Sequence, residues 1–256
     1  MYLIRPSLPD LQSLFKMTRR TNGIFHFKQF SVKHDRCAHK VGTDGVLLGA
    51  WANVQGAKRI LDVGAGSGVI ALMLAQRSSN DTHIDAIDIS QADCDQAKEN
   101  VAGSPWPTKV VIRNISLQKF EADPYDLIVS NPPYFIDSAR PPVEGRIRAR
   151  HTELLPQQEL LGSAKRLLAQ GGKLCLILPV TEGQTFLSRA NSSGWHCTRL
   201  CEFRSRTNKP VERLLIQLQV DANKLIHESL LLYQNEVGEE WTAHYKDLTR
   251  DYYLKI

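Results

Sequence analysis

The sequence of 256 residues lacks several features that mark common protein classes. It has no run of eighteen uncharged apolar residues, so no transmembrane helix is predicted. The stretch Met1 to Arg5 has no apolar core of a signal peptide, so we do not expect export and place the protein in the cytoplasm. Internal repeats and low-complexity tracts are missing as well. We therefore expect a soluble protein built around one large domain.

Metal-binding cysteine spacing is also missing. The five cysteines are scattered, and the closest pair, Cys197 and Cys201, has no second pair or histidine set that could complete a zinc site. We expect reduced, mostly buried thiols and no bound metal. The excess of positive charge is small, with a net charge of +5 and a pI near 8.9, and by itself does not establish nucleic-acid binding.

A glycine-rich turn follows the short apolar run 60–63 and precedes the apolar-periodic helix expected over 69–76. Gly64, Gly66 and Gly68 allow a tight strand-to-helix turn and close approach of the backbone to a ligand. Pyrophosphate-binding loops have the spacing G-x-G-x-x-G, whereas here it is G-x-G-x-G with Asp62 two residues before the first glycine. The pattern indicates a nucleotide-type site without a phosphate cradle.

The expected strand 83–89 ends with Asp88, about twenty residues beyond the glycine loop. At this place a carboxylate can accept hydrogen bonds from both hydroxyls of a ribose. Ile89 adjoins it and is included in the candidate cofactor site. Asp85 is expected on the opposite face of the strand or at its start.

A third expected strand, 109–113, delivers Asn114 and Ile115 to the same edge. The side-chain oxygen of Asn114 can accept a hydrogen bond from an adenine amine. The alternative is that Asn114 is a simple turn residue. We include both residues in the candidate cofactor site.

The turn Asn131-Pro132-Pro133-Tyr134 directly follows the strand-like run 125–130. An exocyclic aromatic amine is a poor nucleophile, so an enzyme must hold its N–H groups with acceptors that favour the reactive geometry. The Asn131 side-chain oxygen and the Pro132 carbonyl are candidate acceptors, the prolines stiffen the turn, and Tyr134 offers a face for stacking. A turn that merely ends a strand is the alternative.

These polar residues fall at the carboxyl ends of successive expected strands, where open α/β sheets bind ligands. The fold class predicted is a doubly wound, mostly parallel, seven-stranded α/β sheet with an antiparallel terminal strand. Its later elements are expected as a helix over 156–169, a strand over 173–178, a helix over 182–192 and two edge strands over 197–203 and 213–220.

We divide the chain by composition and pattern. The divisions are an N-terminal extension over 1–20, a cap with a hairpin and helix over 21–52, a catalytic domain over 53–220 and a C-terminal extension packing on it over 221–256.

Two groups of basic residues could bind nucleic acid. The first follows the Asn131 turn and could grip phosphates around an extruded base, although a solvated loop is the alternative; it contains Arg140, Arg146, Arg148 and Arg150. The second could extend that track and contains Arg199, Arg204, Arg206, Lys209 and Arg213. The run 25–30 interleaves three phenylalanines with Lys28 and fits either a buried hairpin or a surface that stacks on RNA.

Several further motifs accompany the glycine loop and the Asn131 turn, namely the runs 27–30, 34–38, 40–45, 47–51 and 248–255. Together these motifs resemble the bacterial valine-tRNA (adenine-N6) methyltransferase family, and the resemblance covers nearly all of the chain after residue 20. The resemblance implies a Rossmann-like class I methyltransferase, S-adenosylmethionine as cofactor, and adenine 37 of a tRNA anticodon loop as substrate.

The resemblance also implies roles for particular residues. Asp62 and the loop backbone would hold the methionine end of the cofactor, and Lys40, Thr43 and Asp44 would lie over it. The alternative for Thr43 and Asp44 is that they only cap a helix starting at Gly45.

Two other functions remain open at this stage. A release-factor-type enzyme would methylate a protein glutamine amide in the same Asn-Pro-Pro-Tyr turn, and a non-enzymatic RNA-binding protein would use only the basic surfaces. The arginine-rich loop argues against the first, and the glycine loop argues against the second. The tRNA isoacceptor and the oligomeric state are left open, with a monomer favoured.

Overall fold

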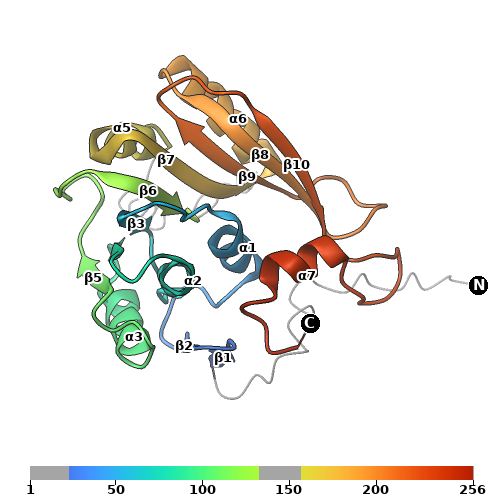
Figure 1. The fold of residues 1–256 in the computed structure, drawn as a ribbon, viewed down its shortest axis with the longest axis horizontal. Coiled ribbons are helices and arrows are strands. Elements are labelled where there is room, and N and C mark those ends of the chain that lie inside the picture. The colour runs from blue at the N-terminus through green and yellow to red at the C-terminus, as the bar shows by residue number, and fades with distance from the viewer. Residues whose placement is uncertain (1–22, 133–156, 256) are drawn as a thin grey trace, which may run out of the picture.

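A central eight-stranded sheet organises the computed structural model, which describes residues 23–132 and 157–255 (Figure 1). The strand order is β10-β8-β9-β7-β6-β3-β4-β5. The strands are β3 (Arg59–Val63), β4 (His83–Asp88), β5 (Val110–Asn114), β6 (Tyr125–Ser130), β7 (Leu168–Pro179), β8 (His196–Arg204), β9 (Arg213–Gln219) and β10 (Ile226–Leu231). A separate antiparallel pair consists of β1 (Ile24–His26) and β2 (Ser31–Lys33).

The sheet is mostly parallel. Strands β5, β4, β3, β6 and β7 run in one direction, β9 is antiparallel to both of its neighbours, and β8 and β10 are parallel to each other. The predicted fold class is therefore confirmed. Beyond the seven expected strands, the segment after residue 220 supplies the eighth, β10, which pairs with β8.

The expectation that the last two predicted strands lie at the sheet edge was wrong. Strand β9 lies between β7 and β8, and β8 lies between β9 and β10. The reason is visible in β9, where Leu214, Leu215, Ile216 and Leu218 are all buried. A strand that is apolar on both faces needs neighbours and covers on both sides, as internal strands have.

Helices cover both faces of the sheet. One face carries α1 (Thr43–Trp51), α2 (Val69–Arg77) and α3 (Gln91–Ala102), and the other carries α5 (Gln157–Leu167) and α6 (Val180–Ser192). In α5 the buried residues Leu160, Leu161, Ala164 and Leu167 form one stripe at helical spacing. Among the residues described, no helix is long and apolar enough to span a membrane.

The helix predicted over 156–169 ends earlier than expected, at Leu167, and β7 begins at Leu168. The chain then passes through Gly171, which has a φ of 74°. A Cβ atom at Gly172 would lie 2.9 Å from the carbonyl oxygens of Ala169 and Tyr125. The two glycines therefore permit a bulge within β7 where the sequence pattern suggested a helix stop.

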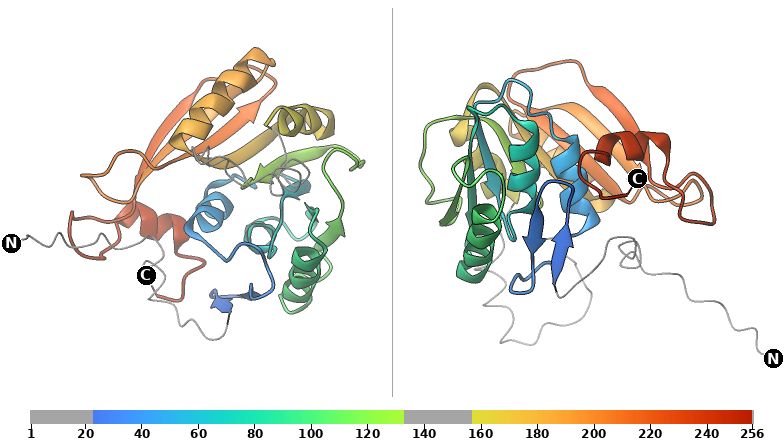
Figure 2. Two further views of the ribbon diagram at one scale, coloured as in Figure 1. Left: turned by 180° about the vertical axis from the view of Figure 1, so that it is seen from behind. Right: turned by 60° about the horizontal axis from the view of Figure 1, so that its bottom comes forward.

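The N-terminal hairpin is part of the core. Phe25, Phe27 and Phe30 are each no more than 5% exposed, and the right view of Figure 2 shows β1 and β2 on the same side of the sheet as α3 and α7 (Ala243–Thr249). The Lys28 amide donates to the Tyr252 carbonyl, which ties the hairpin to the C-terminal segment. The buried-hairpin interpretation is confirmed, and the RNA-stacking alternative was wrong because the rings face inward.

Candidate active site

Four strand ends meet at the carboxyl edge of the sheet. Val63 is level with both Ile87 and Ser130, and Asp88 is level with Asn114. Asp88 and Asn114 are the last residues of β4 and β5, and the glycine loop and Asn131 directly follow Val63 and Ser130. The structure thus brings the described candidate residues from β3, β4, β5 and β6 to one edge.

The glycine loop has a backbone that other residues rarely adopt. The φ angles of Gly64 and Gly66 are 76° and 52°, and a Cβ atom at either position would meet no other atom within 4 Å. The glycines are therefore required by the left-handed backbone and not by crowding within the protein. The loop leaves open space beside its backbone, which is a cradle that a ligand can fill.

Asp62 lies at the start of this cradle and is fully buried. Its Oδ2 accepts a hydrogen bond from the Ala71 amide at 3.1 Å, whereas Oδ1 has no partner within the part of the chain that the structure describes. Burial raises the pKa of Asp62 to about 7. A buried carboxylate oxygen without a donor is costly, so this geometry favours a ligand that brings a cation or N–H group.

Asp88 connects the loop to the next helix. Its Oδ2 accepts from the Gly66 amide and its Oδ1 from the Ser90 amide, both at 2.9 Å. Burial raises its pKa, while these backbone bonds oppose the rise. Each carboxylate oxygen has a further lone pair for a hydroxyl group. Ile89 follows at 51% exposure and presents an apolar surface next to this carboxylate.

Asn114 and Ile115 both bond to the end of β4. The Asn114 amide group donates to the Asp88 carbonyl at 3.1 Å, and the Ile115 backbone amide donates to the same oxygen at 3.0 Å. Because this bond uses the NH2 group of Asn114, its side-chain oxygen is the atom that could accept from an adenine amine. Asn114 is the last residue of β5 and not part of a turn, and its binding of adenine stays a prediction.

The acceptor turn is joined to the glycine loop. The Ser130 hydroxyl, fully buried, donates to the Val63 carbonyl at 2.9 Å. Val63 precedes Gly64, and Asn131 follows Ser130, so this bond fixes the two motifs relative to each other. Tyr134 lies outside the described residues, as do Arg140, Arg146, Arg148 and Arg150.

Helix α1 approaches the same edge. It begins at Thr43 after the N-cap residue Gly42, which makes no side-chain capping hydrogen bond in the described structure. The alternative that Thr43 and Asp44 cap a helix starting at Gly45 was therefore wrong. Asp44 instead accepts a hydrogen bond from Nε of Arg213 at 2.9 Å. Lys40 is exposed just before the helix. The contact of Asp44 with Arg213 had no signal in the sequence, since 169 positions separate the two residues.

The second basic group is largely engaged within the protein. Arg204 contacts Glu202 at 3.4 Å, and Arg206 donates to the carbonyls of Asn235 and Gly238 with its guanidinium over the Tyr233 ring. Arg199 donates to the Glu228 carboxylate and the Trp51 carbonyl. Lys209 lies in the loop between β8 and β9, at the carboxyl edge. A linear sequence cannot show most of these internal acceptors, which come from α1, β8, β10 and the loop after β10.

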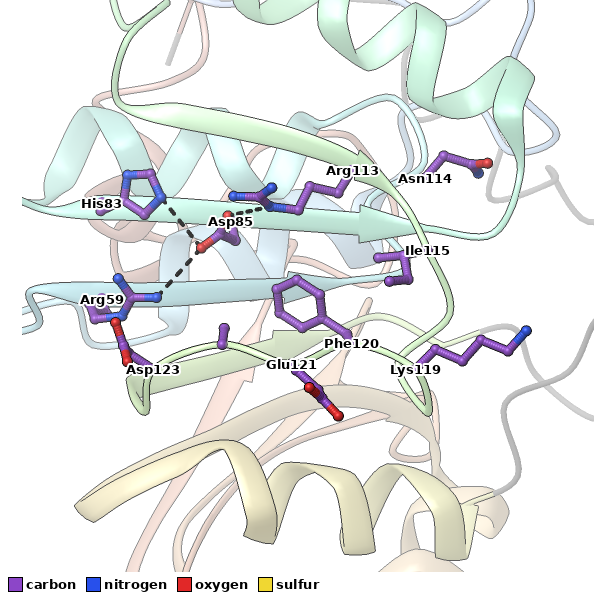
Figure 3. A pocket seen from close by; sticks show the side chains of 11 residues that line it. Arg59, His83, Asp85, Arg113, Asn114, Ile115, Lys119, Phe120, Glu121 and Asp123 are labelled. Carbon is purple, nitrogen blue, oxygen red and sulfur yellow. Dashed lines mark hydrogen bonds and ion pairs between the residues drawn. The ribbon is translucent and has the colours of Figure 1, made fainter.

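A pocket of 620 Å³ lies on the other face of β4 from the α2 side, and Figure 3 shows its lining. Only Asn114 and Ile115 are shared with the candidate cofactor site. The remaining lining residues are Arg59, His83, Asp85, Arg113, Lys119, Phe120, Glu121, Ala122 and Asp123. Three cationic and three acidic side chains balance there, so the pocket has no clear charge preference. The cradle beside the glycine loop is therefore the better candidate for the cofactor site.

Comparison with known proteins assigns the family. The methyltransferase small domain matches residues 41–187. Proteins named tRNA1(Val) (adenine(37)-N6)-methyltransferase from Bacteroides thetaiotaomicron and Serratia proteamaculans are 44% and 41% identical, over 92% and 99% of this chain and 99% and 98% of theirs.

Solved structures agree on the fold. A predicted O-methyltransferase from Agrobacterium tumefaciens has a TM-score of 0.62 at 17% identity and covers 82% of this chain and 96% of its own. The glycopeptide N-methyltransferase MtfA, solved with S-adenosylmethionine, has a TM-score of 0.52 at 14% identity over 70% of this chain and 95% of its own. The sequence relatives and the fold together show that the chain belongs to the tRNA1(Val) (adenine(37)-N6)-methyltransferase family.

Proposed function

We propose that this protein transfers a methyl group from S-adenosylmethionine to N6 of adenine 37 in the anticodon loop of valine tRNA. The observation that carries the proposal is the direct connection of two motifs, in which the Ser130 hydroxyl binds the Val63 carbonyl between the Asn131 turn and the glycine loop. The names of relatives that match nearly the whole chain support the substrate.

The described residues fit the cofactor. Asp62 and the glycine loop would hold its methionine end, because the buried Oδ1 of Asp62 has no donor among residues 23–132 and 157–255, and Gly64 and Gly66 leave room beside the backbone. Asp88 would accept from the ribose hydroxyls. The remaining candidates on this side are Lys40, Thr43 and Asp44 at the methionine end and Ile89, Asn114 and Ile115 around the adenine. When bound, S-adenosylmethionine supplies an electrophilic methyl group on a sulfonium.

Asn131 and Pro132 provide the acceptor side of the reaction. Their side-chain and backbone oxygens would accept the two N–H groups of the target amine and hold its lone pair toward the donor. The chain needs no strong general base, since the alkylated amine is far more acidic than the starting amine and releases its proton readily. Adenine must leave the stack for this contact, which costs less in a loop than in a duplex. Tyr134 is proposed to stack on the extruded ring.

Basic side chains are the proposed contacts of this protein with its tRNA substrate. Arg140, Arg146, Arg148 and Arg150 are proposed to bind its phosphates, with Lys209 and the exposed parts of Arg204 and Arg206 extending the surface. A tRNA substrate supports a cytoplasmic location.

Asn131→Ala tests the proposed function. We expect the single-turnover rate of methyl transfer to fall at least 100-fold while S-adenosylmethionine affinity stays within about threefold, because the removed acceptor acts chiefly in the transition state. Asn223→Ala, in an exposed loop, is the matched control and should keep the wild-type rate. Radiolabelled methyl transfer is measured with valine tRNA and with release factors. Labelling of release factors alone, or a normal rate for Asn131→Ala, would contradict the proposal.

A further inference from the structure

Helix α1 presents its amino end to the active-site edge. Its other end lies near the end of α2, where Arg77 donates to the carbonyls of Gly49 and Ala52 at 2.8 and 3.0 Å. Since α2 starts at the glycine loop and ends at Arg77, α1 runs beside it in the same direction. The first turn of α1 therefore lies toward the carboxyl edge, and its cap, Gly42, contributes no side chain to hold it there.

Arg213 reaches that turn from the sheet. It is the first residue of β9, which is antiparallel, so its position is also at the carboxyl edge. It is level with Pro179 of β7, whereas Ser130 of β6 is level with Leu176. Arg213 thus lies about three residues, or roughly 10 Å, beyond the level of Ser130 along the strand direction. From there its side chain can contact the first turn of α1, which lies beyond the carboxyl edge of the sheet.

The contact between Arg213 and Asp44 is well defined. Nε of Arg213 donates to Oδ2 of Asp44 at 2.9 Å, and a terminal nitrogen donates to the Glu212 carbonyl at 2.9 Å. The two side chains are 24% and 20% exposed, compared with 62% and 59% for the surface pair of Lys58 and Asp81. The Asp44 pair is therefore less screened by solvent, and two bonds orient the guanidinium group.

We propose that Arg213 is a positioning residue for methyl transfer. Through Asp44 it fixes the first turn of α1 above the carboxyl edge and thereby sets the separation of the methyl donor from the amine held at Asn131. The inference rests on the proposed function. Because transfer requires an in-line approach, a displacement of α1 by about 1 Å is enough to slow the reaction strongly.

A second arginine provides a matched comparison. Arg199 of β8 also holds α1 from the sheet, but at the opposite end, through the Trp51 carbonyl and a guanidinium centred 4.2 Å from the Trp51 ring. Its loss should weaken the attachment of the helix without moving the turn that faces the active site. Arg199→Met therefore separates general loosening of α1 from the positioning of its first turn.

The test compares Arg213→Met, Arg213→Lys, Asp44→Asn, the Met/Asn double variant and Arg199→Met. We measure the single-turnover rate at saturating cofactor and tRNA, the KM for tRNA at several salt concentrations, and the melting temperature. We expect Arg213→Met and Asp44→Asn each to lower the rate at least tenfold with the tRNA KM within about threefold. The double variant should be no slower than the slower single variant, because each single change already breaks the contact between Asp44 and Arg213. Arg213→Lys should recover part of the rate, and Arg199→Met should lower the melting temperature while keeping the rate.

Three results would overturn the inference. A normal rate for Arg213→Met would leave the ion pair without a role in transfer. A higher tRNA KM with a shallower salt dependence and a normal rate would make Arg213 an RNA contact. Multiplicative losses in the double variant would show that the two residues act separately. If Arg213→Met does not fold, Arg213→Lys and Asp44→Asn carry the same test. Failure of the wild-type protein to methylate tRNA would overturn the proposed function itself.

Discussion

Two buried aspartates on neighbouring strands have opposite surroundings. Asp62 of β3 is level with Ala86, next to Asp85 of β4, and the two carboxylates point to opposite faces of the sheet. Asp85 is in contact with Nε of Arg113 at 3.0 Å, His83 at 3.4 Å and Arg59 at 3.8 Å (Figure 3). It also accepts a hydrogen bond from the Tyr125 hydroxyl at 2.8 Å. Asp62 accepts one backbone bond and has a second oxygen without a partner among the described residues.

The difference separates a carboxylate that holds the fold from one that is available to a ligand. Burial raises the pKa of Tyr125, so its hydroxyl stays protonated and donates to Asp85. Such a network compensates the cost of burying a charge. Within the described part of the chain, Asp62 has no comparable set of donors, so the free-energy cost of burying its charge is not offset at the place where the cofactor cradle begins. A stability deficit of this kind is common at functional sites.

The largest expected effect is on cofactor binding by Asp62→Asn. We expect S-adenosylmethionine affinity to fall about 100-fold, close to 2.7 kcal/mol, because a charged acceptor of the ligand is lost. The same variant should be more stable at pH 8 by about 1 to 2 kcal/mol, since a buried charge is removed. Calorimetry and chemical denaturation measure the two quantities. Unchanged affinity would place Asp62 outside the cofactor site.

The converse change, Asp85→Asn, should affect stability and not the cofactor. We expect the free energy of unfolding to fall by about 2 kcal/mol, a value discounted because the Arg113 side chain is half exposed. Cofactor affinity should remain within about twofold of the wild type. A large loss of affinity with normal stability would break the distinction between the two aspartates.

The pH dependence of S-adenosylmethionine binding gives a further test of the role of Asp62. The pKa of Asp62 is raised to about 7, so the free protein binds a proton there that a cationic ligand must displace. Affinity should therefore fall about tenfold between pH 8 and pH 6. The unfolding free energy contributed by this group should fall as pH rises from about 4 to 7, because the folded state holds the proton more tightly. Asp62→Asn should show neither dependence, and a flat profile in the wild type would contradict the assignment.

The sequence predicted the positions of site residues best where these residues lie at the ends of parallel strands. Asp88, Asn114 and Asn131 could be placed together because parallel strands bring their carboxyl ends to one edge, and the structure confirms that arrangement. The sequence was least successful for arginines. The same charge in the sequence can contact RNA or a carbonyl of the next loop, as Arg206 does with Asn235. The sequence also could not show that the three phenylalanines of the N-terminal hairpin are buried, because the segment that the hairpin contacts lies near the C-terminus.

The sequence by itself determined the glycine spacing, the polar residues that end each strand and the alternation that makes the sheet, since these depend on neighbours along the chain. The tertiary structure decided which charged groups are satisfied. The fold brings together Asp44 with Arg213 and the donors around Asp85. It also leaves one oxygen of Asp62 without a partner among the residues that the structure describes. Burial and partner geometry set the free energy of a charge, and neither exists before the sheet has formed.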